Sequence, residues 1–251
     1  TRHLSNRISP ARTNFINELA DYIFTTGESV REDMIKYNRI KPELIQSIPT
    51  GIDVDVFDPV LYDREVCRQQ FNLQEDEVAI GIIAVLRQFK RHDLFLEMAR
   101  LLVDSYPDKK LVFLLAGDGP QKDNIVSLID QLELTSKVRM LGHVGQVPEL
   151  LTALDAFVLS SDSKEGVPQS VMQALLMNKS VVATNSGSTR DLLNGDNFQL
   201  IEAGSVQALV DAISFYLDGN NLNHDRSFII KHYSKAVMSK KIVHLYHLLL
   251  A

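Results

Sequence analysis

Short apolar runs alternate with amphipathic stretches through most of this 251-residue chain. The runs 78–85, 110–116 and 156–160 are nearly continuous in apolar residues. The stretch 94–103 instead carries its apolar residues at helical spacing. Strands that are apolar on both faces, with helices between them, are typical of a parallel sheet covered on both sides. This alternation therefore predicts an α/β fold with a parallel sheet at its centre.

The same pattern predicts where the elements of this sheet lie. Strands are expected at 78–85, 110–116, 138–141, 156–160, 180–184 and 198–201. Helices are expected at 94–103, 121–132, 147–154, 168–177, 206–216 and 237–250. Six parallel strands with helices on both faces make a complete doubly wound, Rossmann-like domain.

The first fifty residues fit this domain less well. Residues 21–25 are typical of a strand and 29–37 of a helix, which makes one βα unit with nothing in front of it. A lone unit cannot bury both of its faces, so we interpret it as the end of another α/β domain. The turn-rich stretch 49–53 is the expected junction.

Composition excludes several classes of protein. With 45% apolar residues, the chain can form a full core and is not globally disordered. The 26 Lys and Arg against 32 Asp and Glu give a net charge of −6, which argues against a dedicated nucleic-acid binder. The single Cys67 excludes a disulfide scaffold and a Cys-rich zinc module. No apolar run approaches the roughly 18 residues of a membrane span, and no signal peptide is visible, so we expect a cytoplasmic protein.

Ligands of doubly wound sheets bind beyond the carboxyl ends of the strands, so the loops there are the expected binding sites. The segment 160–168 leaves a strand and opens a helix. Pro168 suits the first helical position, and Gly166 allows the backbone to approach a ligand closely. The free amides of the first helical turn then form an anion site.

Two polar side chains flank this anion site. The Glu165 carboxylate precedes the helix and can accept hydrogen bonds from a neutral polyol. Gln173 lies about 8 Å further along the helix axis, within reach of a sugar hydroxyl if phosphate binds at the helix start. The alternative is an N-capped surface helix whose dipole Glu165 favours.

A basic loop, 87–92, follows the first strand of the sheet. Arg87 can bind phosphate through two hydrogen bonds and Lys90 can bind it as a point charge, which favours a diphosphate ligand. The alternative is a solvated basic loop.

Two glycine-containing turns follow the next two strands. Gly117 and Gly119 lie in a tight strand-to-helix turn that is neither a GxGxxG fingerprint nor a Walker A loop. The segment 142–145 contains His143 and can place backbone against a base, although His143 alone is typical of a polar loop residue.

Two groups of potential metal ligands have simpler explanations. Asp53 and Asp55 have an Asp-x-Asp spacing, but they lie in the expected junction and not at the end of a core strand. His232, His244 and His247 lack the carboxylate of a His-Glu-x-x-His site. We therefore expect no metal site.

Taken together, these segments resemble the retaining glycosyltransferases of family four, which have the two-domain GT-B fold. The match covers nearly the whole chain in the same order. The segments that carry it are 20–23, 27–29, 48–53 with Phe57, 86–90, 116–120, 141–144, 165–168, 181–184 and 232–246.

The resemblance implies a division of the chain. Residues 1–48 would be the C-terminal end of the N-terminal, acceptor-binding domain, most of which would lie outside this chain. Residues 49–235 would form the nucleotide-sugar donor domain. Residues 236–251 would form a helix that crosses back toward the acceptor domain.

The resemblance also implies roles for particular residues. Arg87 and Lys90 would bind the donor diphosphate and stabilise the charge of the leaving group. Glu165 would hydrogen-bond the transferred sugar. The segment from Gly166 through Val167, Pro168, Gln169 and Ser170 would present amides to phosphate or sugar oxygens.

The base would contact the loop at His143 and Val144, and Gly117 and Gly119 would also belong to the nucleotide-binding residues. Gln173 stands where the family has a second carboxylate. A glutamine can still bind ribose hydroxyls but carries no charge.

The implied reaction is retaining transfer of a sugar from a nucleotide diphosphate sugar to an acceptor hydroxyl, with no cofactor and no essential metal. Family members often build bacterial surface polysaccharide or lipopolysaccharide, so a glycan or glycolipid is the expected acceptor, and a location at the inner face of the membrane would follow from it. Two alternatives stay open: a nucleotide-sugar epimerase of similar fold, and a non-catalytic nucleotide-binding α/β module.

Overall fold

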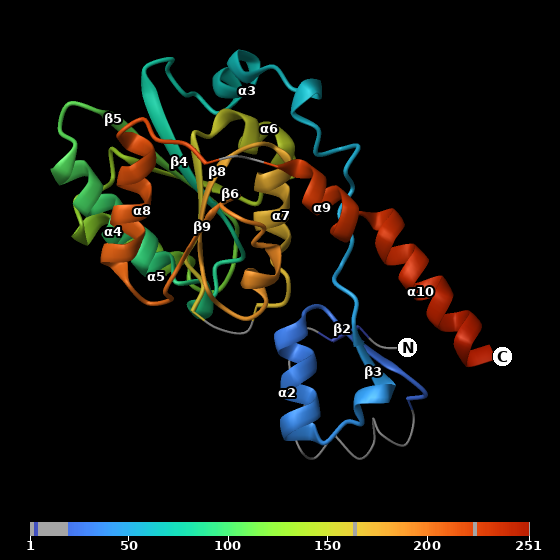
Figure 1. The fold of residues 1–251 in the computed structure, drawn as a ribbon. Helices are drawn as coiled ribbons and strands as arrows, with labels where there is room; N and C mark the ends of the chain where they lie inside the picture. The colour runs from blue at the N-terminus through green and yellow to red at the C-terminus, as the bar shows by residue number, and fades with distance from the viewer. Residues whose placement is uncertain (1–2, 5–19, 163–164, 223–224, 251) are drawn as a thin grey trace.

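The computed structural model describes residues 3–4, 20–162, 165–222 and 225–250 (Figure 1). Its main body is a six-stranded sheet, parallel throughout, with the strand order β6-β5-β4-β7-β8-β9. The strands are β4 (Glu77–Ile83), β5 (Lys110–Ala116), β6 (Val138–Gly142), β7 (Ala156–Leu159), β8 (Ser180–Thr184) and β9 (Gln199–Ile201). The predicted doubly wound sheet is thereby confirmed, although β4 ends two residues earlier than expected.

The central strands are apolar on both faces because each face is covered by helices. In β4, Ile80 and Ile82 are fully buried on one side of the sheet, while Ala79 is fully buried on the other. A Cβ on Gly81 would approach Leu154 Cδ1 to 2.5 Å, so a larger residue would not fit against the neighbouring helix end. The continuous apolar run is therefore a consequence of two separate cores.

Two groups of helices cover the sheet (Figure 1). One side carries α4 (His92–Ser105), α5 (Lys122–Gln131) and α8 (Val206–Leu217). The other carries α6 (Val147–Ala153), α7 (Gln169–Leu176), α3 (Arg64–Gln70) and α9 (Arg226–Tyr233). The sequence pattern missed α3 and α9, because each has seven or eight residues and buries too few of them to show helical periodicity.

The N-terminal unit is a small parallel sheet and not a lone βα unit. Its strands β1 (His3–Leu4), β2 (Ile23–Thr25) and β3 (Ile45–Ser47) lie in the order β1-β2-β3. The expectation that nothing stands in front of the unit is therefore wrong. The helix α2 (Glu28–Asn38) covers this sheet through Val30 and Met34.

The chain passes between the two units twice, and the two crossings are bonded to each other. The Ile52 amide donates to the Tyr233 carbonyl and the Lys235 amide donates to the Ile52 carbonyl, both at 2.8 Å. A Cβ on Gly51 would come within 2.7 Å of Lys235 Cα, so glycine is required at this close approach. Ser234 is extended and separates α9 from α10 (Lys235–Leu250).

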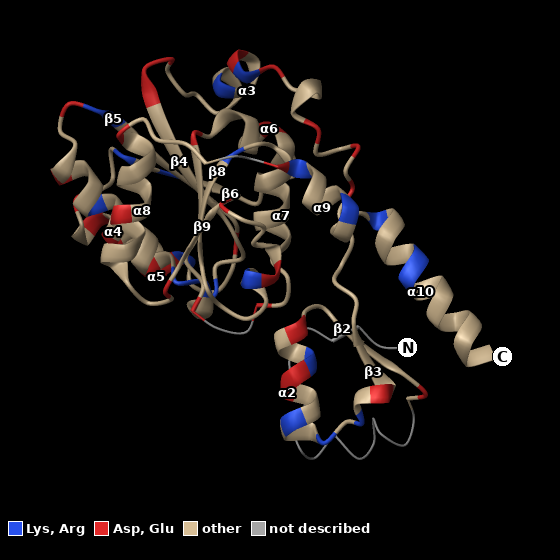
Figure 2. Ribbon diagram, in the orientation of Figure 1, with Lys and Arg blue, Asp and Glu red and all other residues tan. Residues whose placement is uncertain are grey.

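Beyond the crossing, α10 lies against the N-terminal unit. Leu245 is buried together with Phe24 of β2 and Ile48, which follows β3. The charged residues of α10 other than histidine are all lysines (Figure 2). The last turn exposes Leu248, Leu249 and Leu250.

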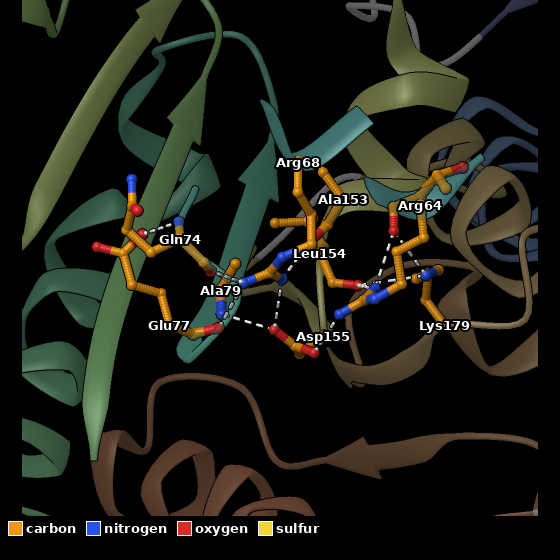
Figure 3. Close-up of polar contacts among 10 residues, drawn as sticks. Arg64, Arg68, Gln74, Glu77, Ala79, Ala153, Leu154, Asp155 and Lys179 are labelled. Atoms are coloured by element: carbon orange, nitrogen blue, oxygen red, sulfur yellow. Dashed lines mark hydrogen bonds and ion pairs between the residues drawn. The ribbon is translucent and has the colours of Figure 1, made fainter. Parts of the chain in front are cut away.

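A polar cluster holds the amino edge of the large sheet together (Figure 3). The Arg68 guanidinium, whose side chain is 8% exposed, donates to the carbonyls of Gln74 and Glu77 at 2.6 Å and to that of Ala153 at 3.1 Å. Asp155 lies beside it at 3.4 Å and also accepts from the Ala79 amide at 2.7 Å. This cluster joins the end of α6 to the start of β4.

Two further cations complete the cluster at the end of α6 (Figure 3). Arg64 and Lys179 both donate to the carbonyls of Thr152 and Leu154, at 3.0 and 3.2 Å respectively. Cations at a helix C-terminus are favourable because the last carbonyls lack partners within the helix. Burial, and then the charge of Arg64, lower the pKa of Lys179 to about 8.

Candidate active site

The loops that follow β4 and β7 meet at the carboxyl edge of the large sheet. These two strands are neighbours at the point where the strand order reverses, which is where doubly wound folds bind ligands. The first loop carries the basic segment 87–92 and the second carries 160–168. The structure thus places the two most informative segments of the sequence side by side.

An ion pair between Lys90 and Glu165 lies at the centre of this edge. The two side chains are only 15% and 10% exposed. The Lys90 ammonium contacts Oε1 of Glu165, and the hydroxyl of Ser161 donates to the same oxygen at 2.7 Å. Two of the predicted catalytic residues are therefore in direct contact.

Backbone contacts fasten the two loops to each other. The Ser160 hydroxyl lies 2.9 Å from the carbonyl oxygens of both Lys90 and Arg91. The Asp162 amide donates to the Phe89 carbonyl at 3.0 Å. No role was predicted for Ser160 or Ser161, although a pair of serines at the end of a buried strand is a signal for such bonds.

Arg87 lies apart from this ion pair. Its side chain is exposed and lines a cavity of about 700 Å³ between the basic loop and α5. Neither Lys90 nor Glu165 lines this cavity. Within the described part of the chain, no hydrogen bond or ion pair of the Arg87 side chain is present.

The buried imidazole of His92 lies at the start of α4, next to the basic loop. It is 3% exposed, and its Nε2 has no hydrogen-bond partner among the described residues. Burial, reinforced by the positive charge of Lys90, lowers the pKa of His92 to about 4. The imidazole is therefore neutral near pH 7.

This buried histidine predicts an acid-sensitive fold. His92 ionises near pH 6.5 when unfolded but near 4 when folded, so its stabilising contribution is present above pH 6.5 and is lost as the pH falls toward 4. The free energy of unfolding of the wild type, relative to His92→Leu, should fall by about 3 kcal/mol between pH 7 and pH 4. Urea titrations at several pH values measure this difference. The exposed Ser127→Ala, which removes no titratable group, should show no such trend, and a pH-independent difference for His92→Leu would contradict the prediction.

Gly117 and Gly119 leave space for the backbone of the neighbouring loop, at Ala84 and Leu86. Their φ angles are +152° and +155°, and a Cβ on them would come within 1.9 Å of the Ala84 carbonyl oxygen and 2.7 Å of the Leu86 carbonyl oxygen. These glycines therefore let the loop after β5 approach the loop after β4, which carries Lys90 further along.

The backbone at Gly166 approaches the N-terminal unit. A Cβ on Gly166 would lie 2.3 Å from Thr26 Oγ1, and the Val167 amide donates to the Thr26 carbonyl at 2.9 Å. In this structure the close neighbour of Gly166 is Thr26, and the approach of a ligand to Gly166 stays a prediction. The Val167 amide is likewise already paired.

The loop after β8 supports Glu165 from the other side. The Ser188 amide donates to the Glu165 carbonyl at 3.1 Å, while the Ser188 hydroxyl accepts from the Ser29 amide at 3.0 Å. Asp191 accepts from the Glu28 amide at 3.4 Å, and burial raises the pKa of this carboxyl. The start of α2 thus touches the loops that hold Glu165.

The start of α7 is placed one residue later than expected. Pro168 precedes the helix as its N-cap instead of occupying the first helical position, and the first intrahelical bond runs from the Met172 amide to the Pro168 carbonyl at 3.3 Å. The amides of Gln169 and Ser170 lie in the first turn, where no carbonyl of the same helix can accept them. Gln173 is half-buried one turn further on.

The remaining predicted positions lie at the edge of the site or outside it. His143 is exposed just after β6, and Val144 packs against the core beside α6 and α7. Asp53 is paired with Lys235 at 2.8 Å, which lowers the pKa of its carboxyl. Among the described residues, no cluster of three His, Cys, Asp or Glu could hold a metal ion.

Known proteins share both the sequence and the fold. The family of glycosyl transferases group 1 matches residues 63–233. The UDP-Gal:alpha-D-GlcNAc-diphosphoundecaprenol alpha-1,3-galactosyltransferase of Escherichia coli is 24% identical over 196 residues, covering 77% of this chain and 50% of that protein. The putative teichuronic acid biosynthesis glycosyltransferase TuaC of Bacillus subtilis is 31% identical over 204 residues, covering 78% and 47%. The chain thus spans about half the length of these relatives.

Among solved structures, Anabaena HepE in complex with UDP and glucose superimposes with a TM-score of 0.86 at 19% identity, covering 98% of this chain and 70% of that one. No helix in the described ranges has both the length and the apolar character needed to cross a bilayer. The family match favours the transferase over the epimerase and the non-catalytic module considered above. The family model covers more than half of the sequence, and the chain belongs to the glycosyl transferases group 1.

Proposed function

We propose that this chain is the donor-binding half of a retaining glycosyltransferase that uses a nucleotide diphosphate sugar. The observation that carries the proposal is the buried Lys90–Glu165 ion pair at the carboxyl edge of the sheet, directly before the first turn of α7. In this proposal residues 49–235 form the donor domain, 1–48 belong to the acceptor domain, and 236–251 form the returning helix. The contact of Leu245 with Phe24 and Ile48 supports the last assignment.

In this proposal Lys90 and Glu165 have different roles at the bond between the donor sugar and the diphosphate. The Lys90 ammonium offsets negative charge as the nucleoside diphosphate leaves, and Glu165 accepts hydrogen bonds from the transferred sugar. The amides of Gln169 and Ser170 receive phosphate oxygens at the positive end of the α7 dipole. Val167 joins them only when Thr26 releases its amide.

The other predicted positions surround the nucleotide. His143 and Val144 contact the base next to the glycine turn of Gly117 and Gly119, and Gln173 binds the ribose. Arg87 is proposed as a second diphosphate ligand. Because its side chain is exposed and makes no contact with Lys90 or Glu165 in the described structure, it has to swing inward when the donor binds.

The acceptor is proposed to be a glycan or glycolipid of the cell surface. This rests on the relatives, one of which is named for transfer to a diphosphoundecaprenol-linked sugar and another for teichuronic acid biosynthesis. A lipid-linked acceptor would bring the cytoplasmic enzyme to the inner face of the membrane. The proposed transfer needs neither an essential metal ion nor an organic cofactor.

A nucleotide-binding panel tests the donor assignment on this chain. UDP, GDP, ADP and TDP are titrated by calorimetry into the wild type, Lys90→Ala, Arg87→Ala and, as a matched control, the exposed Lys122→Ala. We expect one nucleoside diphosphate to bind and its Kd to rise about 10-fold or more in Lys90→Ala, the equivalent of one charge-assisted bond to phosphate. A smaller increase is expected for Arg87→Ala and none for Lys122→Ala.

Two outcomes contradict the proposal. If none of the four nucleotides binds the wild type, the donor assignment is wrong for this chain. If one binds equally well to the wild type and Lys90→Ala, a site exists but is not the one proposed.

A further inference from the structure

The carboxylate of Glu165 has two unequal oxygens. Oε1 receives both the Lys90 ammonium and the Ser161 hydroxyl. Within the described residues, Oε2 has no hydrogen-bond partner. A carboxylate with one oxygen anchored and one open presents a single acceptor in a fixed direction.

We propose that Ser161 is a positioning residue that orients Glu165 toward the donor sugar. This inference rests on the proposed function, because it assigns Oε2 to a sugar hydroxyl. A lone Lys90 contact would let the carboxylate rotate about its last bond, since an ammonium is a point charge without directional preference. The Ser161 hydroxyl, at 2.7 Å from Oε1, supplies the direction.

Ser161 is itself held rigidly. It is fully buried, and its carbonyl accepts a hydrogen bond from the hydroxyl of Thr184, which is also fully buried at the end of β8. The same Thr184 hydroxyl lies 3.2 Å from the carbonyl oxygen of Leu159. The position of Ser161 is therefore set by two core strands, β7 and β8.

The backbone of Glu165 is fixed independently of its side chain. Its carbonyl accepts from the Ser188 amide at 3.1 Å, and a Cβ on Gly187, whose φ is +56°, would lie 1.9 Å from that carbonyl oxygen. With the backbone held from the β8 loop, loss of the Ser161 hydroxyl frees only the carboxylate. Ser161→Ala should accordingly weaken the contact between Glu165 and the sugar and leave nucleotide binding unchanged.

A double-mutant cycle tests the contact without requiring activity. Urea unfolding midpoints are measured for the wild type, Ser161→Ala, Glu165→Ala and the double variant. We expect a non-additive result, in which Ser161→Ala shifts the midpoint less when Glu165 is already absent. Additive shifts would show that Ser161 and Glu165 do not interact and would overturn the inference.

A second experiment measures activity in the full-length protein. UDP and UDP-glucose are the probes, and the measured rate is that of UDP-glucose hydrolysis. Ser161→Ala should lower kcat about 10-fold, the rate equivalent of one hydrogen bond to a charged group, with the Kd of UDP unchanged. Ser161→Thr, which keeps the hydroxyl, should recover most of the rate. Ser127→Ala, which removes an exposed hydroxyl of α5, is the matched control and should leave kcat unaltered.

The outcomes separate the two claims. A wild type that hydrolyses the sugar nucleotide while Ser161→Ala keeps full kcat overturns the positioning role and leaves the proposed function standing. If the wild type binds none of the four nucleoside diphosphates, both the proposed function and the positioning role of Ser161 are overturned, even where the cycle shows coupling. A rise in the Kd of UDP equal to the loss in kcat indicates general damage to the site and also overturns the inference.

Discussion

Replacing Glu165 by Gln in the full-length protein is expected to lower kcat for sugar transfer by about 100-fold or more, the usual effect of losing one charge-stabilising group. The substitution keeps the size of the side chain but removes its negative charge. Lys90 then loses its counter-ion in a position where only 15% of its side chain is exposed. The sugar also loses the open carboxylate oxygen. Steady-state kinetics with the preferred nucleotide sugar measure the effect.

The Kd of the nucleoside diphosphate for Glu165→Gln distinguishes a loss of catalysis from a loss of nucleotide binding. Without Glu165, the charge of Lys90 is free to attract the diphosphate, so nucleotide affinity should stay the same or improve while kcat falls. Glu97→Gln, on the exposed face of α4, is the control and should leave both quantities unchanged. Transfer at the wild-type rate by Glu165→Gln would exclude a role for this carboxylate in catalysis.

The second large effect concerns stability. Asp155→Ala is expected to lower the free energy of unfolding by about 3 kcal/mol, because removal of one partner leaves a buried charge uncompensated. The buried charge is Arg68, and the Ala79 amide loses its acceptor as well. Asp155 itself is 34% exposed in its side chain, so solvent screens part of the interaction and the estimate stays at the low end of the usual range.

The measurement is the urea midpoint at constant m value. Asp155→Asn keeps an acceptor for the Ala79 amide and should lose less stability than Asp155→Ala. Asp108→Ala, in an exposed turn, should lose almost none. Equal midpoints for Asp155→Ala and Asp108→Ala would show that the cluster of Figure 3 contributes little to the fold.

The large sheet could be predicted from the sequence because its signal is local. Each strand is a run of apolar residues that bury both faces, and the helices between them repeat apolar residues at helical spacing. The six strands were found at the expected places for this reason. The loops at the carboxyl edge followed from the fold, so Lys90 and Glu165 could be named as candidates at this edge. Their direct contact was not predicted, because it depends on β4 and β7 being neighbours in the sheet.

What could not be predicted depends on contacts between distant segments. The strand β3 buries only Ile45 of its residues, so it lacks the apolar run that marks the other strands, and its one partner among the described strands is β2. The hydrogen bond from the Val167 amide to Thr26 joins residues 141 positions apart, and neither sequence segment has a local feature that predicts it. The bond from Ser161 to Glu165 spans four residues but depends on a loop conformation that β7, β8 and the basic segment impose together.

The paired crossings between the two units have a consequence for how such proteins diversify. Residues 52 and 234 form a parallel bridge, so everything between them leaves the N-terminal unit and returns to it at one place. Topologically, the large domain is an insertion with its two ends in contact, and domains with adjacent ends tolerate transplantation. The segment 52–234 could therefore be exchanged as a cassette between relatives. Under the division of the chain proposed above, such an exchange would bring a new donor specificity without changes to the acceptor-binding domain.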